Sequence, residues 1–302
     1  MNHAPERVRE DALWHQVTVN FADYSVAEHV GAVHIGPIMT GAETAGRTRA
    51  WFFVRKAPCW RIRFLVAHGT GQETVVFLHE RLDALRDGGH IAGWAPTIYE
   101  PEIHAFGGPL GMELTHRLFH VDSRHVLAYL GRQDVPPTGH GDQRRELSVL
   151  LCSMLMRGAG QDWYEQGDVW ARVAGIRPDP PDIPAERMNR LEADLRRLMT
   201  VDAGPTSPLL RENGPLAFLT EWAVAFAEAG QRLGGLARNG LLTRGLRAVL
   251  AHQIIFHWNR LGLPYTVQSL IAHTAKTVVL DRDEWPTTMT PLRLPGARGD
   301  RK

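Results

Sequence analysis

A short hairpin followed by a long helical stretch is the feature that most constrains how this chain folds. The runs 51–55 (Trp-Phe-Phe-Val-Arg) and 60–66 (Trp-Arg-Ile-Arg-Phe-Leu-Val) are rich in aromatic and β-branched residues, which is typical of strands. Only residues 56–59 separate them, so the two strands pair in an antiparallel hairpin. The alternating segment 15–21 and the segment 97–99 predict two further strands. This pairing favours an α+β fold over a doubly wound parallel one.

Helical patterns dominate the chain from Gly111 onward. Glycine and proline punctuation divides this part into six predicted helices, over 110–131, 142–158, 184–201, 215–237, 243–262 and 265–280. Two more predicted helices, over 24–34 and 73–86, lie among the strands. The predicted fold class is α+β, with an N-terminal, mainly antiparallel sheet and flanking helices packed on a C-terminal helical bundle.

The length of 302 residues is enough for one large domain with a sizeable core. We expect a single domain over 13–286, with a sheet part at 13–108 and a helical part at 109–286. The residues before and after it, 1–12 and 287–302, are expected to be disordered.

The composition excludes several partners and compartments. A net charge of +1 gives no bulk attraction to nucleic acid or to an anionic membrane. No apolar run approaches the ~20 residues of a membrane helix, and the N-terminus has no apolar core of a signal peptide. The two cysteines, Cys59 and Cys152, show neither metal-binding spacing nor a disulfide framework, which favours a reducing compartment. The expected location is cytoplasmic.

Two arginines one residue apart, Arg61 and Arg63, are the strongest local signal for a site. Residues i and i+2 of a strand point to the same face, so the two guanidinium groups lie side by side among apolar neighbours. A carboxylate or another strong hydrogen-bonding group is expected opposite them, because an arginine fork binds such oxygens in two places. That group is either a ligand or a structural partner, and Glu100 and Glu102 are natural counterions.

The predicted helix 243–262 is apolar on more than one side and is therefore expected to be buried. Gln253, His257 and Arg260 form one polar stripe on it, at i, i+4 and i+7, and Asn259 lies off this stripe. In such a setting His257 either transfers a proton or only hydrogen-bonds a backbone carbonyl.

Another polar stripe, formed by Glu113, His116, His120 and Ser123, follows the predicted helix 110–131. The spacing of the two histidines fits zinc, but no third ligand of suitable spacing is near, so a solvated polar stripe is the favoured interpretation. The chain has no nucleophile elbow, phosphate loop or dinucleotide fingerprint. No metal and no cofactor is predicted.

Several of these runs, taken in order, resemble a known family. They are Phe-Phe-Val-Arg at 52–55, Arg-Ile-Arg at 61–63, Tyr-Glu-Pro-Glu at 99–102 with Phe-Gly-Gly at 106–108, Leu-Phe-His-Val-Asp-Ser-Arg at 118–124, and Phe-His-Trp-Asn-Arg at 256–260. The ordered set resembles the C-terminal domain of lantibiotic dehydratases and its stand-alone relatives in thiopeptide biosynthesis.

The resemblance implies one of two activities. Elimination domains remove glutamate from glutamylated Ser or Thr residues of a precursor peptide and leave dehydroamino acids. Those domains carry an arginine just before Tyr-Gly-Gly, whereas this chain has Ala105 there, and at the position of His116 they tend to carry a glutamate. Pyridine synthases instead join two dehydroalanines in a formal aza-Diels–Alder cycloaddition, with loss of water and of the leader peptide. The run 55–61 and the Ala105-Phe-Gly-Gly segment are more similar to the synthases.

The resemblance also implies residue roles. His257 and Tyr99 are the predicted catalytic groups. The predicted substrate-binding residues are Arg61, Arg63, Arg55, Glu102, Gln253, Asn259, Arg260 and His104.

The expected partner is a ribosomally made precursor peptide with its leader. The Arg-rich helix 184–201, or Arg232, Arg238, Arg244 and Arg247, is a candidate leader-binding surface. A non-catalytic scaffold that binds the precursor is the alternative from another class, and a homo-oligomer remains open.

Overall fold

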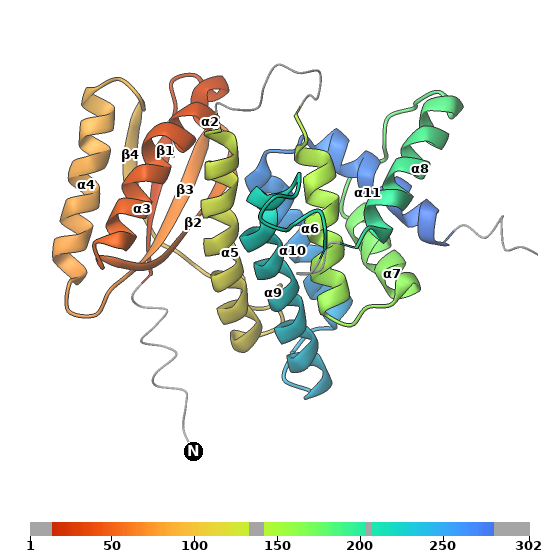
Figure 1. Ribbon diagram of the computed structural model, residues 1–302. Coiled ribbons are helices and arrows are strands. Elements are labelled where there is room, and N and C mark those ends of the chain that lie inside the picture. Colours follow the sequence, from red (N-terminus) through yellow and green to blue (C-terminus); the bar gives the residue numbers. More distant parts are fainter. Residues whose placement is uncertain (1–13, 133–141, 203–206, 281–302) are drawn as a thin grey trace, which may run out of the picture.

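An antiparallel sheet near the N-terminus is followed by a helical bundle (Figure 1). The computed structural model describes residues 14–132, 142–202 and 207–280. The segments predicted to be disordered, 1–12 and 287–302, lie outside the described residues. The predicted fold class is confirmed.

The sheet contains strands β1 (Trp14–Asn20), β2 (Thr48–Lys56), β3 (Cys59–Val66) and β4 (Gly93–Thr97), in the order β2-β3-β1-β4. All neighbours are antiparallel, and β2 and β3 form the predicted hairpin. The fourth strand lies earlier than the predicted 97–99. Its sequence, Gly-Trp-Ala-Pro-Thr, has weak strand propensity, and its proline is tolerated because β4 is an edge strand.

Helices cover one face of this sheet (Figure 1). The predicted helix 24–34 is longer than expected. It consists of a 3-10 turn (Tyr24–Val26), α2 (Ala27–Val30), a π-helical turn (Gly31–Ile35) and α3 (Gly36–Thr44). The helix predicted over 73–86 is confirmed as α4 (Gly71–Asp87). The apolar core between these helices and the sheet includes Val17, Val19, Met39, Phe53, Ile62, Phe64, Leu78 and Leu82.

The C-terminal part contains α5 (Pro109–Leu130), α6 (Arg144–Gly158), α7 (Trp163–Ala174), α8 (Ala185–Thr200), a 3-10 turn (Ala217–Leu219), α9 (Thr220–Arg238), α10 (Leu246–Leu261) and α11 (Tyr265–Leu280). All six helices predicted here are confirmed, and α7 was not predicted. Asp162 and Glu165 form a capping box at the start of α7, a signature that the sequence carries.

Helix α5 lies between the sheet and the rest of the bundle and closes the β2 edge (Figure 1). The backbone N–H of Trp51 donates to His120 Nδ1 at 3.1 Å, and that of Phe53 donates to Ser123 Oγ at 3.3 Å. Side chains of α5 thus take up donors that an edge strand would otherwise leave open to another strand. These hydrogen bonds give His120 and Ser123, two members of the polar stripe on α5, a structural role that involves no metal ion.

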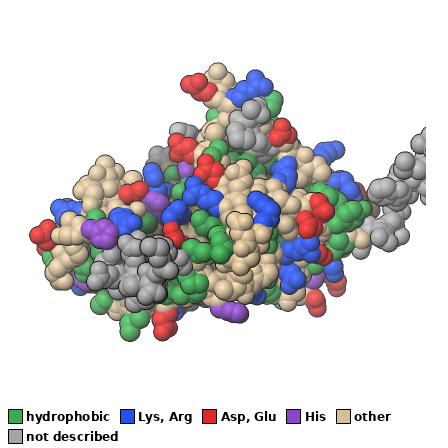
Figure 2. Space-filling view, turned by 90° about the horizontal axis from the view of Figure 1, so that it is seen from below, with side chains coloured by type: hydrophobic (Ala, Val, Ile, Leu, Met, Phe, Trp, Pro, Cys, Tyr) green, Lys and Arg blue, Asp and Glu red, His purple; other side chains and the backbone are tan. Residues whose placement is uncertain are grey.

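The surface carries no field of a single sign on the face shown in Figure 2, where acidic and basic side chains are interspersed with hydrophobic ones. This agrees with the net charge of +1. Within the described ranges, no helix has both the length and the apolar character needed to cross a membrane.

Candidate active site

The sheet face opposite α3 and α4 carries the arginine pair. Arg61 and Arg63 both lie on β3, and Arg63 is aligned with Gln16 on β1 and Phe52 on β2. Phe52 belongs to an apolar cluster with Phe119 of α5 and with three other buried residues, Val54, Phe106 and Met112. Toward β1 and β4 the same face is more open, and Arg61 is exposed.

Arg63 is held by a shell of polar and aromatic groups. Its side chain is 4% exposed, and its Nε donates to Gln16 Oε1 at 2.7 Å. The guanidinium carbon lies 4.3 Å from the centre of the Tyr99 ring, and Nη2 is 3.8 Å from Glu102 Oε1. Among the described residues, the buried Nη1 has no hydrogen-bond partner. Burial lowers the pKa of Arg63, with Tyr99 and Glu102 opposing that shift. Of the two predicted counterions, Glu102 therefore contacts Arg63.

Tyr99 and His116 form a hydrogen-bonded pair beside Arg63. The Tyr99 hydroxyl lies 2.7 Å from His116 Nε2, and the imidazole packs against Trp14 with ring centres 4.6 Å apart. Burial, and to a smaller extent the positive charge of Arg63, lowers the pKa of His116 to about 4. The imidazole is therefore neutral at physiological pH, and a neutral imidazole hydrogen-bonded to a phenol is chemically able to exchange a proton with it.

The sequence analysis predicted Tyr99 as a catalytic residue but did not connect it with His116, its hydrogen-bond partner in the structure. The signal was present in the polar stripe 113–123, in which four residues share one helix face. The tertiary contact that places Trp14 of β1 against His116 of α5 is not visible in that stripe.

His257 lies in a second cluster, sealed within the bundle. Its Nδ1 donates to Asp122 Oδ1 at 2.9 Å, Trp222 Nε1 donates to the same oxygen at 2.9 Å, and Arg260 Nε donates to Asp122 Oδ2 at 2.7 Å. The side chains of His257, Arg260 and Asp122 are at most 1% exposed. Burial by itself would raise the pKa of Asp122, but the His257 and Arg260 charges hold it below its ordinary value. In this position His257 reaches no solvent-borne substrate.

Gln253 and the 104–108 loop have structural contacts. Gln253 Nε2 donates to Thr115 Oγ1 at 2.6 Å and links α10 to α5. Gly107 has a φ of +83°, and a Cβ there would lie 3.0 Å from Leu242 and Val249, so the glycine permits close packing. His104 is exposed on the loop. Roles of Gln253 and His104 in substrate binding stay predictions.

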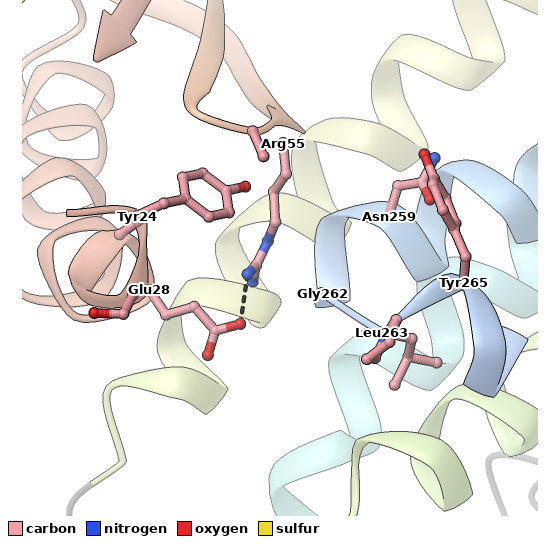
Figure 3. A pocket seen from close by; sticks show the side chains of 11 residues that line it. Tyr24, Glu28, Arg55, Asn259, Gly262, Leu263 and Tyr265 are labelled. Atoms are coloured by element: carbon pink, nitrogen blue, oxygen red, sulfur yellow. Dashed lines mark hydrogen bonds and ion pairs between the residues drawn. The ribbon is translucent and has the colours of Figure 1, made fainter. Parts of the chain in front are cut away.

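A pocket with a volume of 410 Å³ lies at the junction of sheet and bundle and contains two predicted binding residues, Arg55 and Asn259. Tyr24, Glu28 and Arg55 face Asn259 and Tyr265 across it (Figure 3). We call it the junction pocket.

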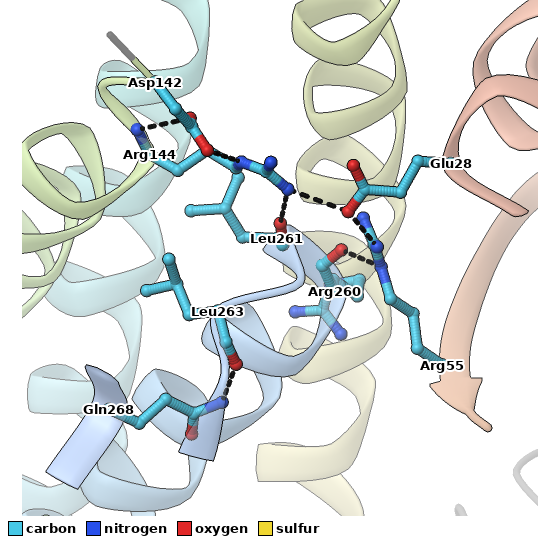
Figure 4. Close-up of polar contacts among 8 residues, drawn as sticks. All are labelled: Glu28, Arg55, Asp142, Arg144, Arg260, Leu261, Leu263 and Gln268. Carbon is cyan, nitrogen blue, oxygen red and sulfur yellow. Dashed lines mark hydrogen bonds and ion pairs between the residues drawn. The ribbon is translucent and has the colours of Figure 1, made fainter. Parts of the chain in front are cut away.

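The wall of the junction pocket is an ion network (Figure 4). Glu28 Oε1 accepts hydrogen bonds from the Nη1 atoms of Arg55 and Arg144, at 2.5 and 2.8 Å. Arg55 Nε also donates to the Arg260 carbonyl at 2.7 Å, and Arg144 Nη1 donates to the Leu261 carbonyl at 3.2 Å. Two arginines thus satisfy the last carbonyls of α10, as cations at a helix C-terminus do.

Gly262 is required where this network crosses the end of α10. We expect Gly262→Ala to destabilise the fold by about 2–4 kcal/mol, because its φ is +82° and the new Cβ would lie 2.6 Å from Arg55 Nη1 and 2.7 Å from Glu28 Oε1. Gly240→Ala is the matched control, since Gly240 has a φ of +66° and nothing within 4 Å of a Cβ. Urea unfolding of both variants measures the difference. Equal losses would show that the network yields without cost.

Comparison with known proteins agrees with this architecture. The family model described as lantibiotic biosynthesis dehydratase C-term matches residues 14–279. The chain belongs to this family. Comparison with curated protein sequences gave no match.

Three solved structures share the fold of this lantibiotic dehydratase C-terminal family member. The tRNA-dependent lantibiotic dehydratase MibB from Microbispora sp. 107891 is 18% identical with a TM-score of 0.66; the match covers 89% of this chain and 28% of MibB. TsrL is 16% identical with a TM-score of 0.56, over 88% of this chain and 97% of TsrL. The pyridine synthase TbtD from thiomuracin biosynthesis is 17% identical with a TM-score of 0.56, over 89% of this chain and 98% of TbtD. Family membership supports a role in the maturation of ribosomally made peptides.

Proposed function

We propose that this protein is a pyridine synthase that acts on a precursor peptide containing two dehydroalanines. The iminol form of an amide next to one dehydroalanine supplies a 2-azadiene, and the alkene of the other closes the ring through two new carbon–carbon bonds. Loss of the iminol oxygen as water and of the leader as its carboxamide then gives the aromatic pyridine. The electrons balance without an oxidant or a cofactor.

The observation that carries this proposal is the neutral Tyr99–His116 pair beside Arg63. Forming the iminol requires a proton to move from the amide nitrogen to its oxygen, and loss of water requires a proton to reach that oxygen. A phenol and a neutral imidazole 2.7 Å apart are suited to both transfers. The exposed Arg61 and the more open part of this sheet face offer hydrogen bonds to peptide carbonyls. Holding both alkenes together supplies much of the rate enhancement.

The buried His257 is better suited to positioning than to direct contact. Its imidazole contacts Asp122 together with Arg260. The Arg260 guanidinium carbon lies 3.9 Å from the centre of the Phe119 ring, which is 5.3 Å from the centre of the Phe52 ring. Phe52 in turn supports Arg63 at 5.3 Å. We therefore assign the proton transfers to Tyr99 and His116, and a supporting role to His257.

One contact favours glutamate elimination as a second candidate function. Ala105 stands where elimination domains are expected to carry an arginine, but Arg244 Nη1 lies 3.4 Å from the Ala105 carbonyl oxygen. A cation from the segment before α10 is thus near that position and is available to hold a departing glutamate.

Mass spectrometry of the purified chain with two peptides separates these functions. With a dehydrated, azole-containing precursor we expect release of the leader together with loss of water. With a glutamylated precursor we expect no change. Loss of glutamate from the second peptide, abolished in Arg244→Ala, would instead establish the lyase. If neither peptide reacts although the precursor binds, the non-catalytic scaffold becomes the better assignment.

A further inference from the structure

Gln16 of β1 connects two parts of the candidate active site. Its side chain is 6% exposed, and it is aligned with Arg63 on β3 and with Thr97 on β4. Its Oε1 accepts from Arg63 Nε at 2.7 Å, and its Nε2 donates to Thr97 Oγ1 at 2.8 Å and to the Ile98 carbonyl oxygen at 3.1 Å. A guanidinium group only donates and a carbonyl oxygen only accepts, so both neighbours require this orientation of the amide.

The bond to Ile98 holds the chain just before Tyr99. Strand β4 ends at Thr97, so Ile98 lies beyond the last residue that pairs with β1. The side chains from 95 to 98 are exposed, and that of Ile98 is 87% exposed, so packing contributes little to fixing this segment. Gln16 thus extends the connection between β1 and β4 by one residue, and the next residue carries the hydroxyl that contacts His116.

The bond to Arg63 fixes the guanidinium group without neutralising it. Gln16 is uncharged, and the carboxylate of Glu102 lies 3.8 Å from Arg63 Nη2, beyond hydrogen-bond distance. Arg63 Nη1 has no hydrogen-bond partner in the part of the chain that the structure describes. An acidic side chain in place of Gln16 would form a short, charge-assisted bond with Nε. A neutral acceptor therefore leaves the positive charge available to a bound carbonyl group and to the neighbouring His116.

The surroundings of His116 make it sensitive to that charge. Tyr99 is hydrogen-bonded to the imidazole, and β1 and β2 face it with the aromatic side chains of Trp14 and Phe52. After burial, the charge of Arg63 is the cause that lowers the pKa of His116. A change at position 16 should therefore reach His116 through Arg63.

We propose that Gln16 is a positioning residue of the candidate active site, which holds Arg63 beside Tyr99 as an uncompensated cation and fixes the chain that leads into Tyr99. Gln16 itself acts only through these neighbours. Its connection with ring formation rests on the proposed function, whereas its effect on Arg63 and His116 does not.

NMR titration of the histidines tests the charge without any substrate. In Gln16→Glu the new carboxylate, held ionised by Arg63, offsets the positive charge next to His116. The pKa of His116 should then rise from about 4 by about one unit. The His116→Gln variant identifies the resonance by its absence. An unchanged pKa of His116 in Gln16→Glu would overturn the proposal.

Gln268 of α11 gives the matched control, because it makes the same pair of contacts outside the candidate active site. Its Oε1 accepts from Arg177 Nε at 2.8 Å, and its Nε2 donates to the Leu263 carbonyl oxygen at 2.7 Å, the contact drawn in Figure 4. Gln268 is also fully buried. Gln268→Glu should therefore leave the pKa of His116 at its wild-type value.

Kinetics of ring formation provide the second readout. Gln16→Met keeps the length of the side chain but removes its hydrogen bonds, and it should lower kcat by about 10- to 100-fold, whereas Gln268→Met should retain the wild-type rate. In Gln16→Glu the rate should begin to fall at a higher pH than in the wild type, because His116 keeps its proton to a higher pH. Equal kcat values for the two methionine variants would contradict the proposal. If the wild type forms no ring but the pKa shift is observed, the proposed reaction fails and the positioning of Arg63 by Gln16 is supported.

Discussion

Asp122→Asn is expected to remove about 3–5 kcal/mol from the free energy of unfolding, a large part of the stability of a typical domain. The carboxylate is fully buried and neutralises Arg260, which is itself 1% exposed. An asparagine would leave that guanidinium charge buried without a counterion. Its amide N–H group would also face a donor, because Arg260 donates to one oxygen of Asp122 and His257 and Trp222 donate to the other. Urea unfolding followed by tryptophan fluorescence measures the loss.

A surface pair gives the matched control for this loss. Asp168 accepts from Arg247 at 2.8 Å, close to the 2.7 Å of the Asp122–Arg260 contact, but the Asp168 side chain is 50% exposed. Asp168→Asn should therefore cost at most about 1 kcal/mol. Adding Arg260→Met to Asp122→Asn should restore part of the lost stability, since both charges are then absent. A cost for Asp122→Asn no larger than that of the control would show that the buried charges relax freely.

The same carboxylate gives the stability a defined pH dependence. The pKa of Asp122 is lower in the folded protein than its ordinary value near 3.9. Its contribution is therefore fully present above about pH 4 and is lost as the pH falls below that value. The difference in stability between wild type and Asp122→Asn, measured by urea titration, should therefore shrink over this acidic range.

The elements with strong local patterns were predictable from the sequence. The hairpin β2–β3 follows from two aromatic runs with a short connection, and α10 follows from a helix apolar on several sides. Strand β4 was misplaced because its pairing with β1, and not its own residues, makes it a strand. Its Trp94 packs on the histidine ring of His79, a tertiary contact without a local signature.

The candidate site was predictable only in part, because its residues meet through tertiary contacts. The arginine pair and Glu102 could be connected from i, i+2 spacing and charge. The contacts of Asp122 with His257 and Arg260 could not be predicted, because these residues lie 135 and 138 positions away from it in the sequence. Spacing along α10 correctly grouped His257 with Arg260, but it did not reveal that both side chains lie in the core. Nor did it reveal that Arg63 lies instead beside Tyr99 and His116.

Tyr99→Phe is expected to lower the rate of ring formation by about 10²- to 10⁴-fold, the usual contribution of a positioned acid or base. The change removes only the hydroxyl that contacts His116 at 2.7 Å and keeps the ring on which the Arg63 guanidinium lies at 4.3 Å. Substrate affinity should therefore change little, so the loss should appear in kcat. Tyr129→Phe, at a half-buried tyrosine of α5 that packs against Phe218, is the matched control and should retain the wild-type rate.

The pH profile of ring formation then tests the role of His116. Because burial lowers the pKa of His116 to about 4, its imidazole can accept a proton throughout the neutral range and loses this capacity only as the pH falls through about 4. The rate should accordingly be level between about pH 5 and 7, where an ordinary histidine near 6.5 would titrate. A rate that instead falls with an inflection near pH 6.5, or that is unchanged in Tyr99→Phe, would exclude this pair from the mechanism. The proton transfers would then belong to a group that is buried in the bundle and must first become exposed.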